Sequence, residues 1–295
     1  MSIKKIMVPL SGQYDPADPV SLERPALECA FRMAQRLRAH VEVVCIEAEP
    51  QKAKENISPW VPGGAVDSLI SAIEAESERR RQRAMELFDT ICTEYDVTCA
   101  SAPGIHPDMT AIFLERFGDM RDSIVLRSRL SDLIVSACPP IDWKSDLPLI
   151  VDRALRNSGR PVLISPPEPL PTLGERVTIA WNGSAGSMRA VGMAMDILQA
   201  AKDVAVIAVD EDNIEDHSGE SLIEYLRWHG VIARLLAVDG NGVPAGQVIL
   251  QQISDENADL LVMGAYTRSH LQRIIFGSVT SEIFSKMRVP VFMVE

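Results

Sequence analysis

The segment Leu260-Leu-Val-Met-Gly-Ala-Tyr-Thr-Arg-Ser-His-Leu-Gln-Arg-Ile-Ile-Phe-Gly-Ser-Val-Thr280 combines a strand pattern, two glycines and a helix start. Its apolar beginning, which ends at Met263, predicts a buried parallel strand. Gly264 follows at once, and Gly277 opens the next predicted helix. Glycine lets backbone N–H groups approach a ligand, and a helix N-terminus adds unpaired donors and a positive dipole end. The segment therefore predicts a phosphate-binding loop, and the alternative is that both glycines only form turns.

This arrangement resembles the nucleotide loop of the universal stress protein family, Gly-x2-Gly-x9-Gly-[Ser/Thr]. Gly264, the nine residues 268–276 and the pair Gly277-Ser278 fit the pattern. Thr267 stands where the family has its second glycine. A threonine resists positive φ and places a side chain beside the phosphates, while its hydroxyl is able to donate to a phosphate oxygen.

The chain contains one pattern twice. Three pairs of segments match: 5–12 with 176–183, 132–137 with 259–265, and 160–165 with 289–294. The offset is 171 residues at the first pair and about 128 at the later ones, so the first half carries roughly 43 additional residues. Most of them fall in 64–95, where apolar residues follow a helical period. Pro166–Pro171 has the composition of a linker. We expect two domains: 1–168, a degenerate universal stress domain with a helical insertion, and 172–295, a universal stress domain with the nucleotide loop.

Strand and helix patterns alternate through the second half. Strands are predicted at Val177–Trp181, Val204–Val209, Ala233–Val238, Leu260–Met263 and Val291–Val294, and helices at Ser187–Ala201, Ser218–Gly230, Ala245–Glu256 and Ser278–Met287. Such alternation indicates right-handed crossovers and a parallel sheet covered on both faces. The resemblance implies an α/β fold of two tandem, doubly wound, parallel-sheet domains of the adenine nucleotide alpha hydrolase-like type. It also implies that the final strands, 161–165 and 290–294, pair inside one chain in a pseudo-twofold arrangement.

Two predicted loops lie where ligands bind open parallel sheets, beyond the carboxyl ends of the strands. One is the turn at residues 181–184, and the other follows Gly264. The resemblance implies an adenine nucleotide held by Ala180, Trp181, Asn182, Val209, Met263, Gly264, Thr267, Gly277, Ser278, Val279 and Thr280. An alternative for the first turn is a helix cap made by Asn182 or Ser184.

The first half keeps Ser11-Gly12 at its opening turn but lacks a later glycine loop. Val135 is followed by Ser136-Ala-Cys-Pro-Pro-Ile-Asp-Trp143, and no glycine occurs before Gly159. Proline has no N–H, so this segment cannot surround phosphates with donors. We therefore expect that the first half has lost nucleotide binding.

Composition limits the remaining functions. The chain has 295 residues, 46% of them hydrophobic, and a net charge of −12, which disfavours nucleic acid and anionic membranes as partners. Its apolar runs are far shorter than the roughly 18 to 20 residues that span a bilayer, and its start shows no signal-peptide core. The five scattered cysteines indicate buried, reduced thiols. The arginine run 79–83 lies among glutamates, which favours a solvated, ion-paired face over an anion site. We expect a cytoplasmic protein.

Patterns of catalysis and of metal binding are absent. There is no Walker A sequence, no Gly-x-Ser-x-Gly turn and no pair of histidines at metal spacing, so we expect no catalytic residue and no metal ligand. The acidic residues between 210 and 216 allow a Mg²⁺ ion shared with phosphates or a plain solvated loop. The resemblance implies a stress-response protein that binds ATP or a related adenine nucleotide, with or without Mg²⁺, and acts on a protein partner. A slow ATPase or phosphotransferase, a nucleotide-free interaction module, and a homodimer of such pseudo-dimeric chains remain open.

Overall fold

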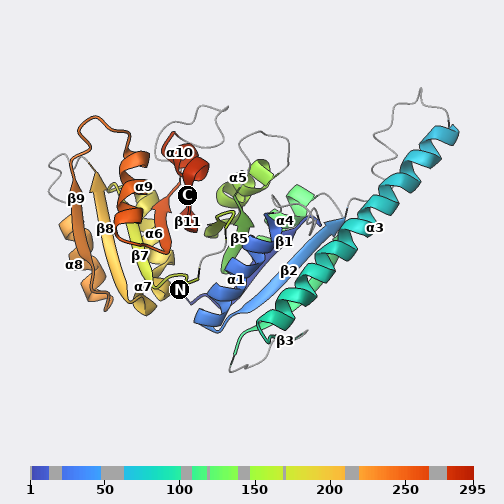
Figure 1. Cartoon of the computed structure of the whole chain (residues 1–295), viewed down its shortest axis with the longest axis horizontal. Coiled ribbons are helices and arrows are strands. Elements are labelled where there is room, and N and C mark those ends of the chain that lie inside the picture. Colours follow the sequence, from blue (N-terminus) through green and yellow to red (C-terminus); the bar gives the residue numbers. More distant parts are fainter. Residues whose placement is uncertain are drawn as a thin grey trace.

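The computed structural model describes residues 2–12, 22–47, 63–100, 108–117, 120–138, 147–168, 171–209, 219–265 and 278–295. In these ranges the strands form one continuous sheet of eleven, in the order β3-β4-β2-β1-β5-β6-β11-β10-β7-β8-β9 (Figure 1). Neighbouring strands run parallel except at β6–β11, the antiparallel junction between the two halves. The strand order on one side of this junction mirrors the order on the other, apart from the additional strand β3. The predicted tandem, pseudo-twofold α/β fold is confirmed.

The elements of the first half are β1 (Lys5–Leu10), α1 (Glu23–Leu37), β2 (His40–Glu47), α3 (Gly63–Glu94), β3 (Thr98–Cys99), β4 (Thr110–Phe117), α4 (Met120–Ser128), β5 (Leu133–Ala137), α5 (Leu147–Ser158) and β6 (Val162–Ser165). Those of the second half are β7 (Arg176–Trp181), α6 (Ala185–Met193), α7 (Met195–Ala200), β8 (Asp203–Val209), α8 (Gly219–Trp228), β9 (Arg234–Val238), α9 (Ala245–Asp255), β10 (Leu260–Gly264), α10 (Ser278–Lys286) and β11 (Val291–Val294). Every strand predicted for the second half is present, and so are the helices, except that the single helix predicted at Ser187–Ala201 is divided at Ala194 into α6 and α7.

The sheet is buried on both faces, which explains why its central strands are apolar at successive positions. Along β10, Leu260 and Val262 belong to a core shared with α1, α3, α6, α7 and α8. Leu261 and Met263 point to the opposite face and pack with residues of α5, α9 and α10. Because side chains alternate across a strand, a continuous apolar run supplies two separate cores.

An aspartate performs the same task in each half. Asp132 accepts hydrogen bonds from the backbone N–H groups of Lys4 and Lys5 at 2.9 and 3.0 Å. Asp259 accepts from Glu175 and Arg176 at 3.1 and 2.9 Å. In both cases the carboxylate satisfies donors at the start of the neighbouring strand. Asp132 directly precedes β5, and Asp259 directly precedes β10. The acidic residue that the two copies of the sequence pattern share therefore connects its own strand to the start of the neighbouring one.

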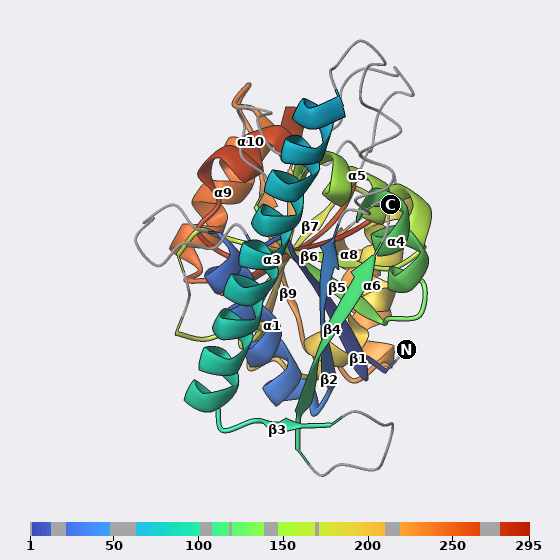
Figure 2. The same ribbon diagram turned by 90° about the vertical axis from the view of Figure 1, so that its right-hand side faces the viewer.

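Helix α3 accounts for most of the additional length of the first half. It joins β2 to β4 as α8 joins β8 to β9, but it has 32 residues where α8 has 10. The predicted insertion is thus a lengthened crossover helix together with the short strand β3, which the sequence pattern did not reveal. Figure 2 shows α3 alongside α1, and Phe31 and Phe88 join the two helices edge to face with ring centroids 6.5 Å apart. The arginine run on α3 is ion-paired as predicted, for example Arg80 to Glu76 at 3.0 Å.

The two halves also meet outside the β6–β11 junction. The backbone N–H of Ile3 donates to the Asp196 carboxylate of α7 at 2.9 Å, and the Arg36 guanidinium of α1 donates to the carbonyl of Ala200 in α7. These contacts connect the N-terminus and α1 of the first half to α7 of the second half. Among the helices that the structure describes, none has the length and apolar character needed to cross a membrane.

Candidate functional site

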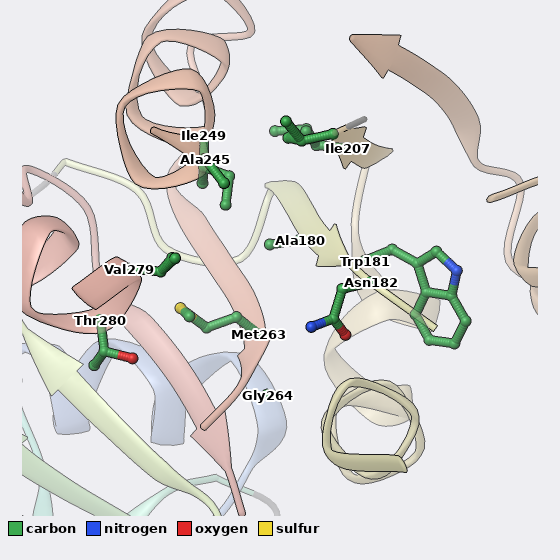
Figure 3. A pocket seen from close by; sticks show the side chains of 11 residues that line it. Ala180, Trp181, Asn182, Ile207, Ala245, Ile249, Met263, Gly264, Val279 and Thr280 are labelled. Carbon is green, nitrogen blue, oxygen red and sulfur yellow. The ribbon is translucent and has the colours of Figure 1, made fainter. Parts of the chain in front are cut away.

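A cavity of about 120 Å³ lies at the carboxyl ends of three strands of the second half (Figure 3). Its lining comes from the ends of β7, β8 and β10 and from the first turns of α9 and α10: Ala180, Trp181, Asn182, Ile207, Val209, Ala245, Ile249, Met263, Gly264, Val279 and Thr280. This is the place in an open parallel sheet where ligands bind. Segments that are up to a hundred residues apart in the sequence converge on it.

The turn after β7 has a fixed shape. Gly183 has a φ of 67°, and Asn182 Oδ1 accepts a hydrogen bond from the Ser184 N–H at 3.2 Å. Ser184 Oγ accepts from the Ser187 N–H at 3.1 Å and is the N-cap of α6. The cap that the sequence left open between two residues is therefore Ser184. In Figure 3 the Asn182 side chain points toward Met263, whereas the Trp181 ring points away from it.

Gly264 has a packing role that the sequence analysis did not foresee. A Cβ at this position would lie 2.6 Å from the backbone nitrogen of Ser187 and 2.7 Å from the carbonyl carbon of Gly186. The missing side chain thus lets β10 approach the first turn of α6. Gly264 lies on the cavity wall as well, so the same glycine sets both the helix position and the width of the site.

The first turn of α10 brings the positive end of a helix dipole to the cavity. Val279 and Thr280 line it, and the Thr280 side chain is buried. Unpaired N–H groups and the dipole favour an anion at such a position. No charged side chain is among the described residues that line the cavity. Nor do the described parts of the chain contain a cluster of three or more histidine, cysteine or acidic residues suited to a metal ion.

The rest of the lining is apolar. Ile207, Ile249 and Met263 are almost fully buried and line the cavity together with Val209 and Ala245. An apolar slot with few polar groups at one end suits a flat, weakly polar ring. Polar substituents of such a ring would extend toward the N-terminus of α10. The geometry therefore combines a surface for a base with a position for an anionic group.

Eight of the eleven residues predicted for the site line this single cavity: Ala180, Trp181, Asn182, Val209, Met263, Gly264, Val279 and Thr280. Thr267 and Gly277 lie outside the residues that the structure describes, as do the acidic residues 210–216. Ser278 is the first residue of α10. The sequence analysis missed Ile207, Ala245 and Ile249. Ile207 lies two residues before Val209 and therefore on the same face of β8, and Ala245 and Ile249 are one helical turn apart.

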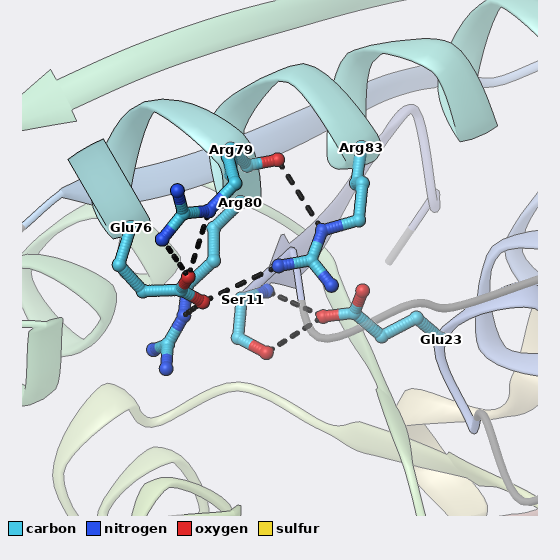
Figure 4. Close-up of polar contacts among 6 residues, drawn as sticks. All are labelled: Ser11, Glu23, Glu76, Arg79, Arg80 and Arg83. Carbon is cyan, nitrogen blue, oxygen red and sulfur yellow. Dashed lines mark hydrogen bonds and ion pairs between the residues drawn. The ribbon is translucent and has the colours of Figure 1, made fainter. Parts of the chain in front are cut away.

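The corresponding turn in the first half, after β1, is contacted by its own chain (Figure 4). The Ser11 N–H and hydroxyl both donate to Glu23 Oε1, at 2.6 and 2.8 Å. Gly12 has a φ of 66°, like Gly183 in the second half, but a Cβ there would lie only 2.0 Å from the carbonyl oxygen of Arg80. An internal carboxylate therefore holds the donors of this turn, and the backbone of α3 lies against it.

Comparisons with known proteins agree with this architecture. The family model described as universal stress protein family matches residues 220–295. A universal stress protein from Archaeoglobus fulgidus covers 99% of this chain and 96% of its own at 17% identity, with a TM-score of 0.66. A putative universal stress protein from Pseudomonas aeruginosa covers 99% and 93% at 15% identity, with a TM-score of 0.55. A universal stress protein in complex with cAMP covers 41% of this chain and 96% of its own at 19% identity, with a TM-score of 0.34.

A comparison with curated proteins gives no significant match. The family match falls on the half of the chain that contains the cavity, and the solved structures extend the similarity in fold to both halves. Residues 220–295 therefore match the model of the universal stress protein family, and the whole chain is similar in fold to a solved universal stress protein.

Proposed function

We propose that the second half binds an adenine nucleotide, with ATP as the first candidate, and that binding is regulatory. The observation that carries the proposal is the convergence of the Asn182 turn, the end of β10 and the first turn of α10 on one cavity. The adenine ring would lie against Ile207, Val209 and Ile249. The phosphates would lie toward the N-terminus of α10, where backbone donors and the helix dipole favour negative charge.

The proposal assigns a regulatory role because the described site offers no catalytic group. Its side chains can position a nucleotide, but no acid, base or metal-binding carboxylate faces the cavity among the described residues. Phosphoryl transfer depends on such groups or on bound metal ions. Binding would thus change the conformation of the protein toward a partner in a cytoplasmic stress response. The first half, whose turn is held by Glu23 and covered by α3, would not bind nucleotide.

The test is a titration of the intact chain with ATP, ADP, cAMP and, for comparison, GTP, each with Mg²⁺ and with EDTA. Ala245→Phe places a ring in the cavity at a half-exposed position in the first turn of α9, and it should weaken ATP binding at least tenfold while the protein remains folded. Gln251→Phe adds the same ring to the exposed side of that helix and should leave affinity unchanged.

Two outcomes of the titration would count against the proposal, and a third would change its ligand. Absence of binding by all four nucleotides would favour a nucleotide-free interaction module. Equal loss of affinity in both variants would place the site elsewhere. Preference for cAMP over ATP would keep the cavity but change the ligand. Dependence of affinity on Mg²⁺ would show whether the ion binds with the nucleotide.

A further inference from the structure

Two of the five cysteines meet at the edge of the sheet where α3 ends. Cys92 lies in the last turn of α3, and Cys99 is the second residue of β3. Between them the chain reverses at Asp96, which has a φ of 52°, and the Val97 N–H donates to the Cys92 carbonyl at 2.9 Å. The chain therefore turns back from α3 into β3, and the Cys99 thiol is a close neighbour of Cys92.

The position of Cys99 is set by the sheet. Cys99 pairs with Ala111 of β4, and the N–H of the next residue, Ala100, donates to the Ala111 carbonyl at 3.0 Å. Cys92 is held from the other side, because its side chain packs in the core below α3. Both sulfur atoms are thus positioned by regular secondary structure on two different elements.

The two thiols differ in their access to solvent. Cys99 is exposed, whereas Cys92 is buried together with Cys29, Cys45 and Cys138. Burial and the neighbouring Cys99 raise the pKa of Cys92 to about 12. A reagent in solution therefore reaches Cys99 first, and Cys92 stands next to it as the resolving thiol.

We infer that Cys92 and Cys99 form a reactive dithiol that a hydroperoxide converts into an intramolecular disulfide. The Cys99 thiolate attacks one peroxide oxygen and the O–O bond breaks, which gives a sulfenic acid on Cys99 and releases water or an alcohol. The Cys92 sulfur then attacks the Cys99 sulfur, the S–O bond breaks, and the proton of the Cys92 thiol leaves with the hydroxide as water. Two electrons pass from the dithiol to the peroxide.

The disulfide would connect the end of the longest helix to the outermost strand of the sheet. β3 pairs with β4 over only two residues, so few hydrogen bonds hold this edge in the reduced protein. A covalent link from Cys99 to α3 would fix the edge strand to the helix. The modification would thus change the first half at a place distant in sequence from the cavity of the second half.

Tryptic digestion offers a direct readout, because cleavage after Arg83 and Arg116 releases one peptide that contains Cys92 and Cys99 and no other cysteine. The folded, reduced chain is treated with hydrogen peroxide, the remaining thiols are alkylated, and the peptide is weighed. We expect the peptide to escape alkylation at both cysteines, to be about 2 Da lighter than the reduced, unalkylated form, and to recover both thiols with dithiothreitol.

Variants distinguish formation of the Cys92–Cys99 disulfide from non-specific oxidation of cysteines. Cys99→Ser should leave Cys92 reduced, and Cys92→Ser should stop at a sulfenic acid on Cys99 that dimedone traps; Cys45→Ser, a buried control in β2, should still form the disulfide. Overoxidation of Cys99 without a disulfide in the wild-type chain, a disulfide between two chains, or oxidation of Cys92 in the Cys99→Ser variant would each overturn the inference. Because Cys99 is exposed, its serine variant tests the proposal even where Cys92→Ser disturbs the fold.

Discussion

Leu163 and Phe292 occupy equivalent positions in the two halves and are also each other's partners across the β6–β11 junction. On either side of them, Val162 pairs with Met293 and Ile164 with Val291. The pseudo-twofold axis therefore passes between Leu163 and Phe292, both of which are fully buried. Each half uses the other to cover a strand edge that would otherwise expose unpaired backbone groups.

Val291→Asp should destabilise the whole chain. Val291 is fully buried and pairs with both Ile164 and Leu261, so a carboxylate there would be buried without a partner. We expect a loss of about 3 kcal/mol or more in the free energy of unfolding, measured by chemical denaturation with a probe in each half. Ile232→Asp, at a position that is 91% exposed, is the matched control.

The same junction predicts how a cut chain behaves. Proteolysis at a site inserted near Pro169, in the linker outside the described residues, should leave both halves in one particle on gel filtration. Free separation of the fragments, or normal stability of Val291→Asp, would contradict pairing of the two halves through β6 and β11.

Two glycine substitutions should have opposite effects. Gly264→Ala places a methyl group 2.6 Å from the backbone of Ser187, so α6 must move, and we expect a loss of about 1 to 3 kcal/mol. Gly192→Ala, within α6, meets no atom within 4 Å and should stabilise the protein by about 0.5 to 1 kcal/mol. Thermal unfolding of both variants tests the role of Gly264, and an unchanged melting temperature for Gly264→Ala would show that the close approach to α6 is not needed.

Stability at low pH should depend on Glu42. Burial alone raises the pKa of Glu42, but hydrogen bonds from Arg127 and the charge of Lys5 outweigh it and hold this pKa below its ordinary value of 4.5. A carboxyl whose pKa is lower in the folded state stabilises the fold above the unfolded pKa and loses that contribution as the pH falls through the folded pKa. Denaturation at pH 7 and pH 3 should therefore show a smaller loss for Glu42→Gln than for the wild type. Equal losses in both proteins would contradict this role.

A regulatory nucleotide site should hydrolyse ATP slowly. With saturating ATP and Mg²⁺ we expect release of phosphate at no more than a few per hour, whereas enzymes typically run at about 1 to 1000 per second. The measurement is phosphate release by the intact chain, with Ala245→Phe as the control for contaminating activity. Faster turnover that disappears in this variant would establish catalysis in the cavity.

Thr267→Gly restores the second glycine of the family's loop pattern. Because threonine disfavours positive φ, a glycine at this position should raise the affinity for ATP if the loop closes through it. Equilibrium titration of the intact variant gives the answer, with Thr280→Ser as a conservative change inside the described site. An unchanged affinity would mean that the threonine fits the bound state.

The sequence predicted the second half well because its signals are local. Apolar runs, glycine turns and Pro-Val starts mark strands such as Leu260–Gly264 and Val291–Val294, and the internal repeat relates them to the first half. In the first half β2, β3 and β4 were not predicted. β3 has only two residues, and β4 mixes apolar residues with Glu115 and Arg116. Such strands are recognisable only through their partners in the sheet.

Residues of the candidate site were predictable where they lie in a turn or at the start of a helix. They were not predictable where the cavity is lined by apolar residues like those of any protein core. Asn182 and Val279 lie at such boundaries, whereas Ile249 is an apolar residue inside a helix and carries no signal of its own. The hydrogen bonds from Ser11 to Glu23 and the contact of Cys92 with Cys99 are likewise products of tertiary structure. The distance between two side chains on different elements cannot be read from the order of residues.

The close approach of the Arg80 backbone to Gly12 places α3 against the opening turn of the first half. Because α3 belongs to the same chain, it competes for this turn at an effective concentration that a dissolved metabolite rarely matches. Under the proposed function, the concentration of nucleotide would therefore change the conformation of the second half alone. One copy of the fold would then act as a fixed reference for the copy that keeps the cavity.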